Sequence, residues 1–278
     1  MVPDMAELVA RTATGKPRVL LIGGSSLGFS VSAESLSKDL NLQVYNLGVH
    51  AGVGYRNIWK NYRASINQET DLVVVSPSYQ MLLPRSWYSP QHCDVVFLTK
   101  SLSKLARSPE CLPAVVWRTY LDWQASHKKT LHKDNVYRRS AHNEFGDLVA
   151  HLGMDNKPVD YQAARDFLKL QPQDVTAYVK FIRDQILSKG YRVLLVPTVI
   201  PERACGADTD YMLDVVTQLL VLNKNLGENI SWPQPVLCLP DDTVFNTAYH
   251  LNAKGRDIRT DIFKQWIKTA LEAKQAQD

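Results

Sequence analysis

The chain contains 278 residues, of which 45% are hydrophobic and 22% are charged, and its formal net charge is +4. This balance excludes wholesale disorder, and the length favours one large domain spanning residues 1–278. No stretch approaches the roughly 18 consecutive apolar residues of a membrane span, and residues 1–16 lack the apolar core of a signal peptide. The chain as given is therefore predicted to be soluble.

The first predicted element is a buried parallel strand over residues 18–22, an unbroken aliphatic run. The run ends at Gly23-Gly24-Ser25-Ser26, and helical spacing with N-cap serines predicts a helix over residues 30–40. A strand, a tight turn and a helix would present a serine at the carboxyl edge of a parallel sheet, beside a helix N-terminus that favours negative charge. A plain strand-to-helix turn is the alternative interpretation.

Two further strands are predicted over residues 42–46 and 71–75, with a helix between them whose stripe includes Ile58 and Trp59. A glycine-rich loop follows the first of these strands and contains Gly48, Gly52 and Gly54. Such a loop is typical of backbone that approaches another group closely, although an ordinary turn has the same composition. The second strand ends at Ser76-Pro77-Ser78-Tyr79, and open α/β folds bind ligands at this edge of the sheet.

The alternation of strand and helix is lost between residues 81 and 170, which we interpret as a helical insertion rather than a second domain. Because it follows the carboxyl end of a strand, it is predicted to form a lid or a glycan-binding subdomain over the site. From Lys100 to Arg139 it carries nine Lys or Arg residues against three acidic residues. Such a basic stretch attracts an anionic polymer or is simply a solvated face.

Regular structure is predicted again after the insertion. The patterns indicate helices over residues 174–190, 210–226 and 256–274, with short strands over residues 192–196 and 235–239. About five mostly parallel strands that alternate with helices predict a three-layer α/β/α sandwich.

The four cysteines do not have the spacing of a metal site, and nothing in the sequence predicts a metal or another cofactor. Cys238 lies in an apolar run and is predicted to belong to the core. Cys93 and Cys111 would pair in an oxidising compartment, but the sequence leaves that question open.

His250 stands just before the last predicted helix, on the loop after the fifth strand. This loop also belongs to the carboxyl edge of the sheet, so His250 and Ser25 can meet there. A serine hydroxyl becomes a good nucleophile when an adjacent base takes its proton, and histidine does so at neutral pH.

Three motifs occur in order: Leu21-Ile22-Gly23-Gly24-Ser25-Ser26, then Asn46-Leu47-Gly48, then Tyr249-His250-Leu251-Asn252 followed by Gly255-Arg256. Together they resemble the SGNH (GDSL-type) hydrolase superfamily, and within it the branch associated with polysaccharide O-acetylation. The resemblance covers residues 17–80 and 172–275. It implies an SGNH or flavodoxin-like fold and chemistry through an acyl-serine intermediate.

The resemblance also implies roles for single residues. Ser25 matches the nucleophile, with Ser26 as the alternative one position later. Gly52 matches the glycine whose N–H joins the oxyanion hole, and Gly48 is its alternative. His250 matches the general base.

The sequence departs from the family pattern at two places. Ser78 stands at the edge where the family has an oxyanion-hole asparagine. Asn246 stands where an aspartate is expected before the histidine, and it can orient the ring but cannot stabilise an imidazolium with negative charge. Asp241 or Asp242 is the alternative third member; otherwise the site is a Ser-His dyad or a degenerate site.

Two functions follow as hypotheses. The first is a serine-dependent carbohydrate O-acetyltransferase or acetylesterase, acting on a polysaccharide that is neutral or anionic, with Tyr79, Tyr249 and Trp87 as sugar-binding candidates. The second is a degenerate SGNH module that binds polysaccharide or a partner enzyme. Expected partners are an acyl donor or a membrane protein of polysaccharide biosynthesis, and not nucleic acid. The resemblance implies a periplasmic or cell-envelope location, with any membrane anchor lying outside this sequence.

Overall fold

A computed structural model describes the part of the chain on which the site is built. The described residues are 17–50, 53, 56, 58–59, 66, 70–78, 81, 93, 105–106, 108–127, 136, 141–161, 180–186, 191–205, 230–231 and 237–275. The predicted helix over residues 210–226 lies outside them. Of the helix predicted over residues 174–190, only residues 180–186 are described, and Ile182 and Ile186 are fully buried there.

The main sheet has five strands, in the order β2-β1-β3-β4-β6, and every pair in it is parallel. These strands are β1 (Arg18–Gly23), β2 (Gln43–Gly48), β3 (Thr70–Ser76), β4 (Val193–Leu195) and β6 (Ile230–Ser231). The first four agree with the predicted strands to within about two residues. Because all strands run the same way, their carboxyl ends meet at one edge, and the predicted α/β class is confirmed.

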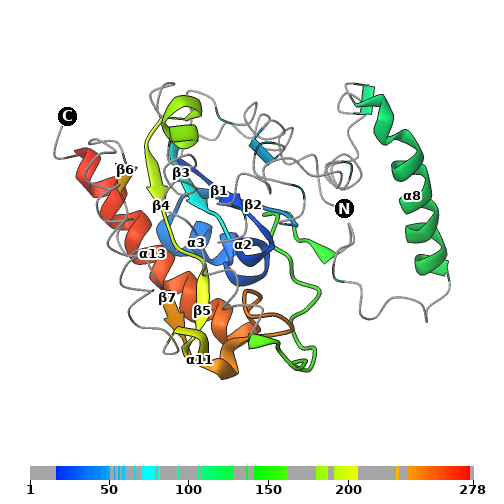
Figure 1. Cartoon of the computed structure of the whole chain (residues 1–278). Helices are drawn as coiled ribbons and strands as arrows, with labels where there is room; N and C mark the ends of the chain where they lie inside the picture. The colour runs from blue at the N-terminus through cyan, green and yellow to red at the C-terminus, as the bar shows by residue number, and fades with distance from the viewer. Residues whose placement is uncertain are drawn as a thin grey trace.

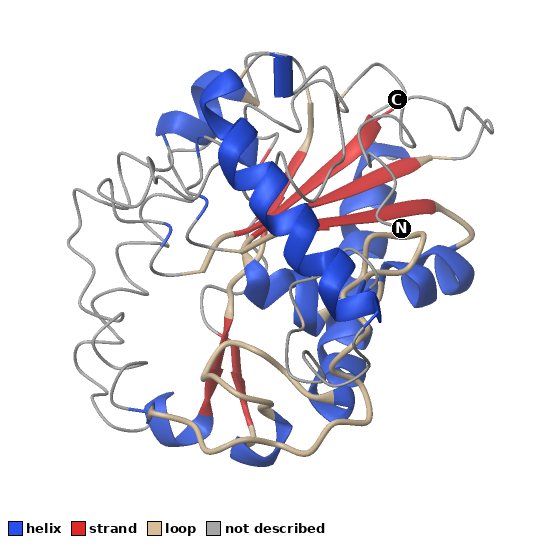
Figure 2. Ribbon diagram, turned by 90° about the vertical axis from the view of Figure 1, so that its right-hand side faces the viewer, coloured by secondary structure: helices blue, strands red, loops and turns tan. Residues whose placement is uncertain are grey.

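The prediction for the fifth strand is wrong about its partner. The predicted strand over residues 235–239 is β7 (Leu237–Leu239), which pairs with β5 (Val199–Pro201) in a separate two-stranded parallel sheet. Figure 2 shows this small sheet apart from the fan of the main sheet. It has its own apolar cluster, which includes Val199, Leu237 and Leu251. An apolar run predicts a buried strand but contains no information about which sheet the strand joins.

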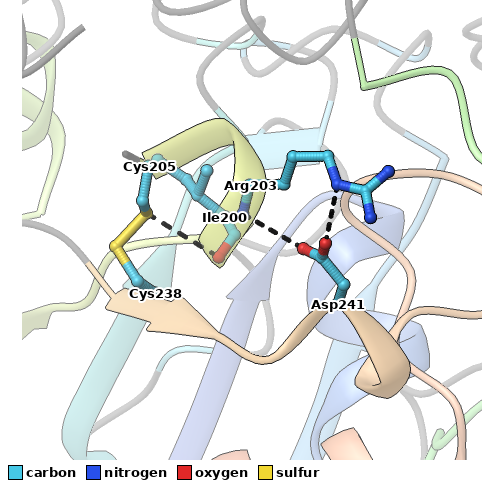
Figure 3. Close-up of a disulfide and its surroundings, with 5 residues drawn as sticks. All are labelled: Ile200, Arg203, Cys205, Cys238 and Asp241. Atoms are coloured by element: carbon cyan, nitrogen blue, oxygen red, sulfur yellow. Dashed lines mark hydrogen bonds and ion pairs between the residues drawn. A yellow bond between two sulfur atoms is a disulfide. The ribbon is translucent and has the colours of Figure 1, made fainter. Parts of the chain in front are cut away.

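Cys238 was predicted to be a core residue, and this prediction is also wrong. Side chains alternate along a strand, so the burial of Leu237 and Leu239 turns Cys238 outward. It forms a disulfide with Cys205 at the end of α11 (Glu202–Cys205), beside the ion pair of Arg203 with Asp241 (Figure 3). A second disulfide joins the pair that the sequence left open, Cys93 and Cys111.

The helix predicted over residues 30–40 is two helices, and the first begins five residues earlier than expected. Helix α2 (Ser25–Ser30) follows Gly24 directly, and α3 (Ala33–Leu40) begins after Ser32. The Ser32 hydroxyl caps α3 by accepting a hydrogen bond from the Ser35 N–H at 3.2 Å. Val31 has an extended backbone, which separates the helices and leaves α2 as a short helix at the end of β1.

Helices α3 and α13 (Ala253–Gln275) pack on one face of the main sheet, as Figure 1 shows for α13 in red. The cluster on that face contains alternate strand residues such as Val19 and Leu21, together with Leu36, Phe263 and Ile267. The strand residues between them are also buried, as expected for a sheet that is covered on both faces. The arrangement is consistent with the predicted three-layer sandwich.

The predicted insertion contains two kinds of structure. Helix α8 (Leu112–His127), in green at the right of Figure 1, follows the short 3-10 helix η5 (Pro109–Cys111). Residues 141–161 instead run along the core as irregular chain: the Asn46 N–H donates to the Phe145 carbonyl, and the Leu148 N–H to the Gly28 carbonyl. Among the described residues, no helix is both long and apolar enough to cross a membrane.

Candidate active site

Ser25 is the first residue of α2, at the carboxyl end of β1. The preceding turn is tight, since a Cβ on Gly23 would lie 2.2 Å from the Ser76 carbonyl oxygen of the neighbouring strand. Only glycine allows this approach, so the strand can turn into a helix directly. Ser25 remains half-exposed, and its hydroxyl therefore lies where both a base and a substrate can reach it.

A closed turn before α13 carries His250. The Phe245 N–H donates to the His250 carbonyl at 2.7 Å, and the His250 N–H donates to the Thr247 carbonyl at 3.2 Å. Asn252 caps α13, because its Oδ1 accepts from the Gly255 N–H at 3.0 Å. A Cβ on Gly255 would lie 2.5 Å from the Thr243 carbonyl oxygen, so this motif fixes the turn against the helix start.

The turn brings Asn246 and His250 together with Ser25 to form a triad. The distance from His250 Nε2 to Ser25 Oγ is 2.9 Å, and the distance from His250 Nδ1 to Asn246 Oδ1 is 2.8 Å. Because an amide oxygen only accepts hydrogen bonds, Nδ1 carries the proton and Nε2 has the free lone pair. That tautomer allows Nε2 to accept the hydroxyl proton of Ser25.

The triad carries no charge, and its surroundings keep it neutral. Burial and, to a smaller extent, the nearby rings of His151 and His50 together lower the pKa of His250 to about 3. The Phe29 ring stacks on the His250 ring, with centroids 4.0 Å apart and an angle of 4° between the planes. The imidazole is therefore held in one orientation and stays unprotonated far below its usual pH range.

The structure separates the alternative triad members from this contact. Ser26 is buried, and its hydroxyl has no hydrogen-bond partner among the described residues. Asp242 is turned to solvent, where its carboxylate accepts from the Lys254 ammonium at 2.6 Å. Asp241 pairs with Arg203 at 3.0 Å. Among these candidates, Ser25 and Asn246 are the ones that contact His250.

The predicted oxyanion-hole residues are placed only in part. Ser78 lies just beyond β3, 5% exposed, and its hydroxyl has no partner in the described part of the chain. The Gly48 N–H already donates to Asn46 Oδ1 at 3.0 Å. Gly52 lies outside the described residues, and so do two sugar-binding candidates, Tyr79 and Trp87. Tyr249, the third, is half-buried beside His250.

A buried carboxylate that the sequence analysis did not predict connects the insertion to α3 and α13. Asp147, in the insertion, is fully buried and pairs with Arg256 of α13 at 3.3 Å. Its oxygens also accept from the Ala33 and Glu34 N–H groups, at 2.8 and 3.1 Å, which satisfies the first turn of α3. The side chain of Asn46 donates to it as well, at 3.1 Å. No sequence signal marked Asp147, which lies in a stretch without periodicity.

Arg259 is the second missed residue, and here the sequence held a signal. It is fully buried, and the buried positions of α13 recur at helical spacing: 255, 256, 259, 260, 263, 267 and 270. Arg256 and Arg259 lie in a stripe that continues with apolar residues at 263, 267 and 270, and arginines at buried positions indicate charges with specific partners. The guanidinium of Arg259 donates to the Ser26 carbonyl at 2.9 Å and to the Pro197 carbonyl at 2.8 Å.

The described residues include no group of three or more His, Cys, Asp or Glu side chains that could hold a metal ion. What they do place together is a hydroxyl, an imidazole in the tautomer of a base, and a helix N-terminus. This is the set of groups needed for nucleophilic attack on an acyl carbon.

Comparisons with known proteins found no matching family model and no matching curated protein. Four chains of solved structures match, among them the following two. One is a carbohydrate esterase whose active site displays divergent catalytic and non-catalytic binding functions, with 10% identity and a TM-score of 0.38 over 91% of this chain. The other is an acetyl xylan esterase from the rumen bacterium Butyrivibrio proteoclasticus, with 12% identity and a TM-score of 0.38 over 92%. The chain spans 65% and 64% of their lengths.

Proposed function

We propose that this chain is a serine-dependent esterase or acyltransferase that forms an acyl-serine intermediate, with a carbohydrate O-acetyl group as the substrate class. The single observation that carries the proposal is the triad contact, 2.9 Å from Ser25 Oγ to His250 Nε2 and 2.8 Å from His250 Nδ1 to Asn246 Oδ1. Two residues 225 positions apart meet in the geometry that activates a serine hydroxyl.

The first half of the reaction acylates Ser25. Its Oγ attacks the ester carbon while His250 Nε2 takes the hydroxyl proton, which gives a tetrahedral oxyanion and an imidazolium. The imidazolium returns that proton to the departing alcohol oxygen as the carbon–oxygen ester bond breaks. Asn246 holds the ring in place through both transfers.

The second half removes the acyl group. Water or a sugar hydroxyl attacks the acyl-serine while His250 takes its proton, and Ser25 leaves with the proton returned. Water gives hydrolysis, and a sugar hydroxyl gives transfer to a new carbohydrate. The oxyanion of both halves would accept from the Ser25 N–H at the start of α2 and from the Ser78 hydroxyl, with Gly52 as a further donor.

A polysaccharide substrate is supported by the surface of the insertion. Three rings on α8 are strongly exposed, with Trp117 at 60%, Tyr120 at 45% and Trp123 at 55%. Their centroids are 5.8 and 6.2 Å apart, so they form a row on one side of the helix. Apolar faces of sugar rings pack on such rows. We also propose that a membrane-bound protein supplies the acyl donor and that the chain acts in the cell envelope.

The alternative function is a binding module with a degenerate site. The observation that favours it is Asn246, because a neutral amide leaves the imidazolium without the negative charge that a carboxylate supplies. The low pKa of His250, about 3, points in the same direction, since it makes the ring a weak base.

Turnover of an activated aryl acetate tests the proposal. Ser25→Ala should reduce turnover by at least about a thousandfold with the fold intact, because the nucleophile is gone. Ser26→Ala is the matched control and should retain turnover, since its hydroxyl does not reach His250. Loss of turnover in Ser26→Ala alone would move the nucleophile by one residue, and equal residual activity in both variants would reject the serine mechanism.

A further inference from the structure

Arg259 connects three elements that meet at the catalytic edge. One terminal nitrogen donates to the Ser26 carbonyl at 2.9 Å and to the Ser30 hydroxyl, at the two ends of α2. The other donates to the Ser76 hydroxyl at the end of β3 and to the Pro197 carbonyl after β4, both at 2.8 Å. The nucleophile helix is therefore joined to the ends of two strands through one side chain.

The guanidinium is well suited to this task and cannot move away from it. Arg259 is 0% exposed, and its guanidinium carbon lies 5.0 Å from the centre of the Phe263 ring. An arginine has several donors spread over a fixed plane, so it reaches acceptors on different elements at once, whereas the donors of a lysine ammonium all sit on one nitrogen. It also stays protonated when buried, which places a permanent positive charge one residue from the nucleophile.

We propose that Arg259 is a positioning residue for Ser25, which holds α2 against the ends of β3 and β4 and so fixes the direction of the Ser25 hydroxyl and N–H. The inference rests on the proposed function for its catalytic consequence, but the positioning itself is a property of the fold. Because Ser26 adjoins Ser25, a shift of its carbonyl moves both the attacking oxygen and the first-turn N–H. The buried positive charge also favours the negative tetrahedral intermediate.

Hydrogen exchange of the α2 amides measures the positioning without any need for turnover. Arg259→Lys keeps the charge but loses the planar set of donors, and Arg259→Met removes both. Ser76→Ala keeps the arginine whole and removes one acceptor, so it serves if the other variants do not fold. Lys268→Met is the matched control, because it removes a charge from the exposed side of the same helix, where Lys268 is 61% exposed.

The expected result is selective loosening of α2. In Arg259→Lys the amides of residues 25–30 should exchange at least about tenfold faster, while those of α3 change little, and Ser76→Ala should show a smaller effect of the same kind. Turnover of an aryl acetate should fall about ten- to a hundredfold in kcat with KM nearly unchanged. Lys268→Met should match the wild type in both.

Two results would overturn the inference. Wild-type exchange of α2 in a folded Arg259→Lys or Arg259→Met chain would show that the arginine does not hold this helix. Equal acceleration of α2 and α3 would show a general contribution to stability and no positioning of Ser25. A wild-type chain without turnover would reject the esterase proposal, while the exchange data would still decide the role of Arg259.

Discussion

The molecule contains two polar clusters, and they are built on opposite principles. The triad of Ser25, His250 and Asn246 has no charged member, and its histidine is kept neutral. The arginine cluster of Asp147, Arg256 and Arg259 is charged and almost completely buried. The comparison shows that the buried charges of this fold hold its elements together, whereas the triad depends on the orientation of the His250 ring.

Breaking the arginine cluster should have the largest effect on stability. Asp147→Asn leaves the Arg256 charge buried without its carboxylate, and removing one partner of a buried ion pair costs about 3–5 kcal/mol. Urea unfolding should show this loss at neutral pH. The matched control is Asp242→Asn, whose partner Lys254 is 58% exposed, so the free energy of unfolding should change by less than about 0.5 kcal/mol. Equal effects of the two substitutions would remove the distinction between the buried and the exposed carboxylate.

The protonation of His151 should make the free energy of unfolding depend on pH. This side chain is buried against Phe29 and Phe245. Burial, followed by the charge of Arg256, lowers its pKa from 6.5 to about 4. The unfolded chain therefore binds a proton at higher pH than the folded chain does, and stability falls as the pH drops below about 6.5. At pH 5 this residue should account for about 2 kcal/mol of the loss relative to pH 8.

His151→Gln tests that assignment, because glutamine does not titrate. Urea unfolding at pH 8 and pH 5 should show a difference about 2 kcal/mol smaller than in the wild type, whatever the variant's stability at pH 8. An unchanged difference between the two pH values would mean that His151 is protonated in both folded and unfolded chains, or in neither.

Adding a charge to the triad should have a smaller effect, of the opposite sign. Asn246→Asp places a carboxylate at the 2.8 Å contact with His250 Nδ1, which favours the imidazolium that forms when Ser25 is deprotonated. We expect turnover of an aryl acetate to rise about ten- to a hundredfold at equal folded fraction. The pKa of His250 should rise from about 3, so the acid limb of the activity profile should move to higher pH.

A loss of turnover in Asn246→Asp, with the pKa of His250 raised as expected, would show that turnover requires a neutral third member. That result would contradict the predicted benefit of an added charge. The pKa is measured by following the imidazole resonances of His250 during an NMR titration, independently of activity.

The sequence predicted much of this architecture, because apolar runs and turn residues are local signals. The strands of residues 18–22 and 71–75 follow from unbroken apolar runs, and the last helix follows from helical periodicity. Contacts between residues that are far apart in the sequence have no such local signal. Nothing local distinguishes Asp147 from a surface acid, because its partners are Arg256 and the start of α3, more than a hundred positions away.

The same limit applied to the site. The motifs brought Ser25 and His250 into one hypothesis, but they could not decide between Asn246 and Asp242, which lie four residues apart on one turn. The decision depends on which side chain faces the ring, and that follows from the hydrogen bonds that close the turn between Phe245 and His250. The break between α2 and α3 was missed for a similar reason, since Ser30 and Ser32 are equally good N-cap residues by type.

Covalent labelling of Ser25 tests the central claim, a working neutral triad, most directly. The folded chain is treated with a fluorophosphonate, and the modified residue is located by peptide mass spectrometry, with His250→Gln and heat-unfolded chain as controls. The account predicts one adduct, on Ser25, formed at least about a hundredfold more slowly in His250→Gln and not at all after unfolding. The contradicting result is the absence of any adduct under conditions in which a known serine esterase is fully labelled.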